Sequence, residues 1–326
     1  MREIKIDEND SKQRLDRFMV KYLPKASKSL INKYIRTKKI KLNKKRANPN
    51  DILQEGDLIQ IYIYEETLSK YEDKKIYTNL DYNLNIIYED DNIAIINKPS
   101  GTLSHAAGKE DYGNNIVDNF IAYLIKTKKY NPRKEKSFVP ALSNRLDRNT
   151  SGLLIGCKNK ETLLQMNNLI KSRKINRNYL TICKGKIEDG LIDSNIKKIS
   201  DNRMEISKDR GKESKTEVKL VTTNGAYSLV KIKLITGRTH QIRVHLQSIN
   251  HPIVGDKKYG DKITNKFFSD NFKLENQLLH SYKIEFNGLE GKLSYLNGKE
   301  FLAEPPVKFK KIIKKIFGEE YENICR

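Results

Sequence analysis

A carboxylate between two arginines is the densest group of potentially reactive side chains in this 326-residue sequence. Residues 144–155 read Asn-Arg-Leu-Asp-Arg-Asn-Thr-Ser-Gly-Leu-Leu-Ile, so Asp147 stands between Arg145 and Arg148 on a polar loop that leads into a strand. Positive charges within about 4–6 Å keep a carboxylate ionised, which is the state that a nucleophile or general base needs. Residues 14–17 repeat Arg-Leu-Asp-Arg before a helical Phe-Met-Val, and an isolated Arg-Leu-Asp is more often a surface ion pair. The continuation Asn-Thr-Ser-Gly into a buried strand distinguishes the copy at Asp147.

A second candidate segment is rich in basic side chains. Residues 236–246 read Thr-Gly-Arg-Thr-His-Gln-Ile-Arg-Val-His-Leu. The pattern predicts a glycine-initiated turn that opens an amphipathic helix carrying Arg238, His240 and Arg243. His240 and Arg243 are spaced i, i+3 and can lie on one face of that helix. Two interpretations stay open: a helix with a basic edge, or an arginine directed at Asp147 or at a phosphate.

The third candidate segment is Arg177-Asn178-Tyr179-Leu180, in which Tyr179 begins a predicted strand. Aromatic rings on strands stack on bases in RNA-binding sheets. Most tyrosines on strands nevertheless belong to the core or its rim, so this segment by itself does not decide between the two roles.

Motifs for cofactors and metals are missing from the sequence. None of the 17 glycines stands two positions from another, so there is no Gly-x-Gly loop for a dinucleotide or a methyl donor. Gly-x-x-x-x-Gly-Lys-Ser/Thr and His-Glu-x-x-His are absent, and the five histidines form no metal-ligand pattern. Cys157, Cys183 and Cys325 are widely spaced, which predicts reduced, buried thiols. An enzyme with this sequence is expected to work with side chains alone, without a metal or cofactor.

The composition favours a polyanionic partner. The chain has 63 Lys and Arg against 41 Asp and Glu, a net charge of +22. Clustered basic side chains release counterions from phosphates and supply most non-specific affinity for nucleic acid. A basic composition without any ligand, a membrane surface and an acidic protein partner are the alternatives. No apolar run approaches the ~20 residues of a transmembrane helix, and residues 1–5 lack the apolar stretch of a secretory signal. A soluble protein of the cytoplasm is therefore expected.

The one-signed charge lies in a predicted N-terminal module, residues 1–64. Between Pro24 and Arg46 there are ten Lys or Arg and no Asp or Glu. Apolar residues at helical spacing predict a helix here, with Ser27 or Ser29 as its N-cap. Such a helix packs its apolar face inward and leaves its charges available for phosphates. The candidate RNA-binding residues are Lys25, Lys28, Lys33, Arg36, Lys38 and Lys39.

Two further regions complete the predicted organisation. Residues 65–81 are polar and weakly periodic, and are expected to form a linker. Residues 82–326 hold strand-like runs joined by turns, among them the pair Asn224-Gly225 between 216–222 and 227–235. The pattern predicts an α+β domain with a mostly antiparallel sheet and flanking helices.

The three candidate segments, in this order, resemble pseudouridine synthases of the RluA type. That family reads Arg-Leu-Asp-x-x-Thr-Ser-Gly, then Lys/Arg-x-Tyr, then Thr-Gly-Arg-x-His-Gln-Ile-Arg-Val-His. Segments 97–101 and 252–256 also match, so the resemblance covers roughly residues 82–306. The N-terminal module resembles the α-L RNA-binding domain named for a small-subunit ribosomal protein. The continuation after Asp256 looks somewhat closer to the RluC branch than to RluD.

The resemblance implies the pseudouridine synthase fold and the isomerisation of uridine in structured RNA, most closely large-subunit (23S) ribosomal RNA. Asp147 would act on the target uridine, and Arg243 would pair with Asp147. Tyr179 would stack on the flipped uracil, and Arg145 would fill the gap left in the RNA. Arg238 and His240 would contact RNA. Bond exchange within one nucleotide needs no redox partner, group donor or ATP, so no cofactor is expected. The protein is expected to be a monomer.

Two stretches depart from the family pattern, and two other functional classes compete. Asn144 stands where many relatives have His, and the basic insert 126–136 is either an RNA contact or a solvated loop.

A non-catalytic ribosomal-RNA-binding assembly factor is the first alternative function, although a pure binder has no reason to keep Asp147 between arginines. A hydrolytic RNA N-glycosidase, which would release the free base, is the second.

Overall fold

The computed structural model describes residues 1–72, 80–132, 137–200, 203–207, 209–321 and 324. The chain divides into two compact units, which are described separately. The first comprises Met1–Tyr82, Asn119–Ala141 and Lys158–Glu161, and the second Asn83–Asp118, Leu142–Cys157 and Thr162–Arg326. In the described part of the chain, no helix is long and apolar enough to span a membrane.

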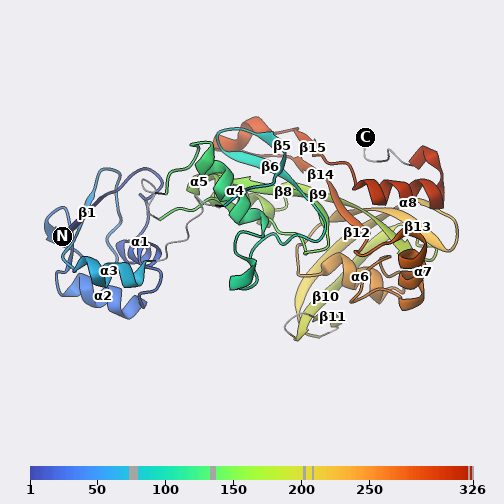
Figure 1. Ribbon diagram of the computed structural model, residues 1–326, viewed down its shortest axis with the longest axis horizontal. Helices are drawn as coiled ribbons and strands as arrows, with labels where there is room; N and C mark the ends of the chain where they lie inside the picture. The colour runs from blue at the N-terminus through green and yellow to red at the C-terminus, as the bar shows by residue number, and fades with distance from the viewer. Residues whose placement is uncertain (73–79, 133–136, 201–202, 208, 322–323, 325–326) are drawn as a thin grey trace. The chain divides into compact units, whose positions relative to one another are not determined.

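The first unit contains the predicted N-terminal module (Figure 1). Its four-stranded sheet has the order β1-β4-β2-β3, formed by Arg2–Lys5, Leu58–Ile61, Ile40–Leu42 and Lys45–Arg46. Helices α1 (Leu15–Tyr22) and α2 (Lys28–Arg36) bury their apolar stripes in a core shared with this sheet. The Ser27 hydroxyl accepts a hydrogen bond from the Leu30 N–H at 3.3 Å, which confirms one of the two predicted N-caps.

The predicted linker at 65–81 is wrong for its first residues. Glu65–Tyr71 form helix α3, and its Leu68 is fully buried in the core of the first unit. Glu65 and Glu66 in the first turn suit the positive end of a helix dipole. A helix of two turns needs few apolar anchors, so the sequence shows little periodicity. Residues 73–79 of the expected linker lie outside the described residues.

The basic insert 126–136 follows helix α4 (Ile116–Lys126), and its residues 133–136 lie outside the described residues. Lys126, Lys128 and Lys129 are exposed. Lys126 pairs with Asp81 at 3.0 Å. The insert therefore places lysines at the surface, as both predicted interpretations of it require.

A large sheet of eleven strands organises the second unit. Its main path is β11-β10-β12-β13-β9-β14-β8-β6-β5, and β7 and β15 join it at β8 and β14. Along this path β14 and β8 pair in parallel and the other neighbours are antiparallel, which confirms the predicted mostly antiparallel sheet. The strands are β5 (Asn85–Glu89), β6 (Ile93–Lys98), β7 (Ala141–Leu142), β8 (Ser151–Cys157), β9 (Ile175–Lys184), β10 (Gly190–Ser200), β11 (Arg203–Ser207), β12 (Lys212–Thr223), β13 (Tyr227–Leu234), β14 (Leu279–Phe286) and β15 (Glu300–Leu302).

Helices and tight turns complete the second unit. The predicted hairpin at Asn224-Gly225 is confirmed, because it joins β12 to β13 and Gly225 takes a left-handed φ of 85°. Gly152 is required for a different reason: a Cβ there would lie 2.2 Å from the Ser281 carbonyl oxygen, so glycine lets β8 approach β14. The helices are α5 (Lys160–Lys171), α6 (Gln241–Ser248), α7 (Lys262–Phe272) and α8 (Val307–Phe317), with 3-10 turns at Lys109–Asp111, Gly291–Leu296 and Glu319–Tyr321.

Candidate active site

The backbone next to Asp147 is held by a buried lysine. Lys98, at the end of β6, is fully buried, and its Nζ donates to the carbonyl oxygens of Pro99 (2.9 Å), Thr102 (2.7 Å) and Arg148 (2.9 Å). Burial lowers the pKa of Lys98 to about 7, and the charge of Asp147 acts in the opposite direction. The three carbonyls take up the three donors of the ammonium group, so this contact fixes the loop directly after Asp147.

On the other side of Asp147, Ser104 and Asn144 hold the loop. The Ser104 hydroxyl accepts from the Leu146 N–H at 3.0 Å and donates to the Leu146 carbonyl at 2.8 Å. Asn144 accepts from the Ile155 N–H of β8 at 2.8 Å. The Asn144 amide therefore ties the loop to its strand.

Arg243 connects Asp147 to a second, buried carboxylate. Its Nη1 donates to Asp147 Oδ2 at 2.8 Å, whereas Nε and Nη2 donate to Asp256 Oδ2 and Oδ1 at 2.7 and 2.9 Å. The side chain of Asp147 is 26% exposed and that of Asp256 is not exposed at all. The second predicted interpretation of residues 236–246 is therefore correct, because the arginine is directed at Asp147.

The electrostatics of the buried pair favour the charged forms of Arg243 and Asp256. Burial opposes the charge of Arg243, but its hydrogen bonds and the charges of Asp256 and Asp147 raise its pKa above the ordinary value. Burial also opposes the charge of Asp256, but the guanidinium of Arg243 lowers the pKa of that carboxyl below its ordinary value. Asp256 is saturated by further backbone donors at Lys258 (2.9 Å) and Tyr259 (3.1 Å). Asp147 alone keeps part of its carboxylate open to solvent.

His240 does not lie in the helix that the sequence predicted. Helix α6 begins at Gln241, and His240 precedes it with a left-handed φ of 57°. Its Nδ1 bonds with the Tyr259 hydroxyl at 3.0 Å, and its Nε2 lies 3.9 Å from Asp147 Oδ2. Burial lowers the pKa of His240, against the opposing charge of Asp147. The neutral imidazole is thus favoured beside the carboxylate. The tight turn, which the periodicity did not show, aims His240 at Asp147 from outside the helix.

A cavity of about 450 Å³ opens beside Asp147 and is lined by the second and third candidate segments. Tyr179 of β9 lies in its wall and is only 4% exposed. Burial raises the pKa of Tyr179, so its phenol stays neutral. Apolar side chains of Ile235 and Leu279 also line the cavity. The Tyr179 ring and these apolar side chains give an aromatic base a surface to lie against, beside charged groups of the same cavity.

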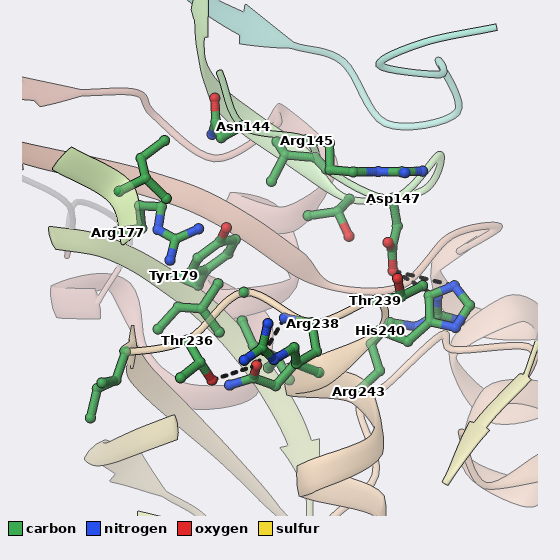
Figure 2. A pocket seen from close by; sticks show the side chains of 18 of the residues that line it. Asn144, Arg145, Asp147, Arg177, Tyr179, Thr236, Arg238, Thr239, His240 and Arg243 are labelled. Atoms are coloured by element: carbon green, nitrogen blue, oxygen red, sulfur yellow. Dashed lines mark hydrogen bonds and ion pairs between the residues drawn. The ribbon is translucent and has the colours of Figure 1, made fainter. Parts of the chain in front are cut away.

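Two arginines stand at the surface of this site (Figure 2). Arg145 is exposed, and the Asp147 carboxylate points toward His240 and Arg243 instead of toward it. Arg238 is exposed as well, precedes α6, and its Nε donates to the Glu213 carbonyl at 3.1 Å. The structure thus brings Arg145, Asp147, Tyr179, Arg238, His240 and Arg243 together around one cavity.

The six candidate RNA-binding residues of the N-terminal module belong to the first unit. Lys25, Lys28, Lys33, Arg36, Lys38 and Lys39 are all exposed, on α2 and its flanking turns. Lys28 lies 3.7 Å from Asp16, and the Lys39 ammonium lies 5.6 Å from the centre of the Tyr34 ring. The apolar face of α2 is buried as predicted, so the charges face outward.

Within the described residues, no group of three or more His, Cys, Asp or Glu is arranged to hold a metal ion. Cys157 and Cys183 are free and buried, and burial raises the pKa of each thiol to about 12. Cys325 lies outside the described residues. Both described thiols are therefore poor nucleophiles, as expected of structural cysteines.

Sequence reasoning assigned no role to four residues of the site: Lys98, Arg177, Asp256 and Tyr259. Lys98 and Asp256 lie in segments that support the family resemblance, but a lone lysine or aspartate carries no sign of burial. Arg177 belongs to the third candidate segment, and its position on the same strand face as Tyr179 is the signal that could have given it a role. Tyr259 lies with its ring 5.0 Å from the Arg243 guanidinium carbon, a contact that no local pattern predicts.

Comparison with known proteins identifies the families that the two parts of the chain match. Residues 92–248 match the family described as RNA pseudouridylate synthase, and residues 13–59 match the S4 domain. The chain is 37% identical to ribosomal large subunit pseudouridine synthase C of Buchnera aphidicola subsp. Baizongia pistaciae, over 87% of this chain and 88% of that protein. It is 41% identical to ribosomal large subunit pseudouridine synthase D of Borreliella burgdorferi, over 69% of this chain and 66% of that protein.

The structure has the fold of a pseudouridine synthase. Human RNA pseudouridylate synthase domain containing 4 is similar to it with a TM-score of 0.56 at 22% identity, over 71% of this chain and 92% of that one. With the sequence relatives, this likeness confirms the predicted class: the chain belongs to the RNA pseudouridine synthase family and carries an S4 RNA-binding domain at its N-terminus.

Proposed function

We propose that this pseudouridine synthase acts on uridines of structured large-subunit ribosomal RNA, with Asp147 as its catalytic carboxylate. One observation carries the proposal. Asp147 is paired with Arg243 at 2.8 Å, remains partly exposed, and borders a cavity walled by Tyr179. Several relatives that match over most of the chain are named as ribosomal large subunit pseudouridine synthases, which supports the choice of substrate.

The reaction exchanges two bonds within one nucleotide. The bond between sugar C1′ and base N1 breaks, the uracil turns within the cavity, and C1′ bonds to C5. The C5 proton is lost and N1 gains a proton, so nothing is consumed. Asp147 starts this exchange as an ionised carboxylate, by attack on the sugar, attack on the base, or removal of a sugar proton. Arg243 holds the carboxylate in place in each case through its 2.8 Å hydrogen bond.

The remaining side chains of the site have supporting roles in this proposal. Tyr179 forms the face on which the extruded uracil lies, and Arg145 extends to the place that the base leaves in the RNA. Arg238 and His240 contact the RNA at the cavity rim. Extrusion costs a few kcal/mol, and base stacking and phosphate contacts of about 1–3 kcal/mol each offset it.

The N-terminal module, which contains the S4 domain, would add affinity for RNA without sequence preference. Its six exposed basic residues suit the phosphates of a folded RNA, where each neutralised phosphate releases counterions. The proposal includes a monomer that works in the cytoplasm, where ribosomal RNA is modified; light scattering of the purified protein tests the oligomeric state.

Mapping pseudouridine in ribosomal RNA tests the proposal. A strain that lacks this gene is compared with the same strain complemented by the wild-type gene, by Asp147→Asn or by Asp16→Asn. We expect at least one large-subunit pseudouridine to disappear in the deletion strain. It should return with wild type and Asp16→Asn but not with Asp147→Asn. Unchanged modification at every uridine would leave the assembly-factor alternative, and abasic sites with free uracil would indicate an N-glycosidase.

A further inference from the structure

Arg177 is a buried cation without a partner at the wall of the cavity. It lies on β9, is only 8% exposed, and lines the cavity with Tyr179. Its Nε is buried without a hydrogen-bond partner. Among the described residues, the structure gives its guanidinium no ion pair, in contrast to Arg243 with its two carboxylates. Buried charged groups are costly unless paired, so this guanidinium is left to be satisfied by a ligand.

The surrounding backbone makes room for the guanidinium. A Cβ on Gly237 would lie 3.0 Å from Arg177 Nη1, so the turn before α6 passes directly against the arginine. Arg177 and Tyr179 are both buried on the same face of β9, because they are two residues apart on one strand. Figure 2 shows the guanidinium beside the Tyr179 ring, facing the cavity.

The sheet register places Arg177 and the Asp147 loop on opposite sides of Tyr179. Tyr179 pairs with Ser281 of β14, and Arg177 pairs with Ile284, further along that strand. The loop of Asp147 enters β8 at Ser151, which pairs with His280 of β14, before Ser281. Along β14 the order is therefore Asp147 loop, Tyr179, Arg177. Two strand residues span roughly 6.6 Å, so Arg177 lies about the length of a pyrimidine from the tyrosine.

A uracil that reaches from Asp147 across Tyr179 presents its far end to Arg177. The ring is joined to the sugar at N1, and the atom opposite N1 is C4 with its carbonyl oxygen O4. We propose that Arg177 is a specificity-determining residue that donates to O4 of the extruded uracil. The inference rests on the proposed function, because it needs Asp147 at the sugar end of the base.

The product offers the same arginine an acceptor. In pseudouridine the sugar is joined at C5, and the atom opposite C5 is C2 with its carbonyl oxygen O2. The uracil that turns within the cavity thus presents a carbonyl oxygen to Arg177 both before and after bond exchange. A guanidinium has donors only, so it can donate to either carbonyl oxygen but cannot pair with the amino group that cytosine has at position 4.

Binding to modified RNA tests the assignment without depending on turnover. The probe is an RNA hairpin around the uridine found by mapping, bound by the non-reacting Asp147→Asn protein. Four versions carry uridine, 4-thiouridine, 2-thiouridine or cytidine at the target. Because a hydrogen bond to a charged group changes affinity by about 10–100-fold, we expect 4-thiouridine and cytidine to bind at least about tenfold more weakly than uridine. The 2-thiouridine probe should bind like uridine.

Variants of the arginine complete the test. In Asp147→Asn/Arg177→Met the four RNAs should bind within about twofold of one another, and Arg177→Lys should keep part of the preference. Arg173→Met is the matched control, because Arg173 is an exposed arginine on the cavity lining and should affect all four RNAs equally. Equal binding of uridine and 4-thiouridine with Arg177 intact would overturn the inference, whether or not the Met variant folds.

One further outcome separates the base from the backbone. If a neutral methylphosphonate at the target weakens binding in the presence of Arg177 and not in Arg177→Met, the arginine binds a phosphate and the assignment to O4 is wrong. Pseudouridine formation by the wild-type enzyme in the same preparation shows that the proposed function stands, so the two failures are distinguishable.

Discussion

The tetrapeptide Arg-Leu-Asp-Arg occurs twice in this chain, and the aspartates of its two copies lie in different environments. Asp16 of the first copy is 1% exposed and is held by its own Arg14, with Nε to Oδ1 at 3.0 Å and Nη2 to Oδ2 at 2.8 Å. Asp147 of the second copy is 26% exposed and is held by Arg243, 96 residues later. The same four residue types therefore give a closed ion pair in one unit and an open carboxylate in the other.

The backbone explains the difference. Arg14 is the N-cap of α1 in an extended conformation, so its side chain folds back onto Asp16 in the first turn. Asp147 lies on a loop before β8, where Arg145 extends into solvent instead. When the neutralising arginine comes from a distant helix, the local arginine is available for RNA and one edge of the carboxylate stays accessible. In this chain the two carboxylates therefore differ in the origin of the arginine that pairs with them, and the residues next to them in the sequence do not show this difference.

Replacing each aspartate by asparagine should separate the two copies most strongly. Asp147→Asn should reduce pseudouridine formation by about 10³-fold or more, because an amide can neither attack nor remove a proton. RNA affinity should stay within about twofold, since a carboxylate does not attract phosphates and the substitution keeps its size. Asp16→Asn should leave turnover per folded molecule unchanged. Single-turnover assays on a ribosomal RNA fragment measure both, and equal losses in the two variants would contradict the distinction.

Removing the two arginines should sharpen the comparison through stability. Arg243→Met leaves Asp256 buried and unpaired, which costs about 3–5 kcal/mol of unfolding free energy. Arg14→Met should cost less, because Lys28 still lies 3.7 Å from Asp16. Arg243→Lys should restore little of the lost unfolding free energy. An ammonium group lacks the planar, forked donors with which a guanidinium binds two carboxylates at once. Urea unfolding of the three variants gives the order, and a larger loss at Arg14 would reverse our interpretation.

These contrasts also mark how far the sequence could predict the site. The pairing of Arg243 with Asp147 was one of two interpretations that the spacing left open, and the family pattern favoured it. The burial of Asp256 could not be predicted, because it depends on turns and strands that pack from elsewhere in the chain. Helix α6 starts at Gln241 rather than at the glycine because His240 takes a left-handed conformation. Local periodicity does not encode such a turn.

The closed ion pair of Asp16 should appear in the acid stability of the protein. Burial acts against its charge, but Arg14 lowers the pKa of Asp16 below the ordinary value. The pair therefore stabilises the folded state above the unfolded pKa of about 3.9, and this contribution is lost as the pH falls through the folded pKa. Asp16→Asn should flatten the fall in unfolding free energy below about pH 4. Thermal unfolding between pH 3 and pH 7 measures the slope, and parallel curves for variant and wild type would contradict it.

The smallest expected effect concerns the exposed basic side chains of the N-terminal module. Deleting residues 1–64 should flatten the salt dependence of RNA binding, but it would also uncover Leu68, which is buried in the same core.

Single neutral substitutions test the phosphate contacts without disturbing this core. Lys33→Gln should reduce the slope of log K against log[salt] by about 0.7–0.9, the contribution of one phosphate contact. Lys5→Gln is the matched control, because Lys5 is exposed in the same unit but outside the one-signed segment. Because we propose that the target uridine is selected around Asp147, the preference among target uridines should be unchanged in both variants. Equal slopes for Lys33→Gln and wild type would show that α2 does not contact phosphates.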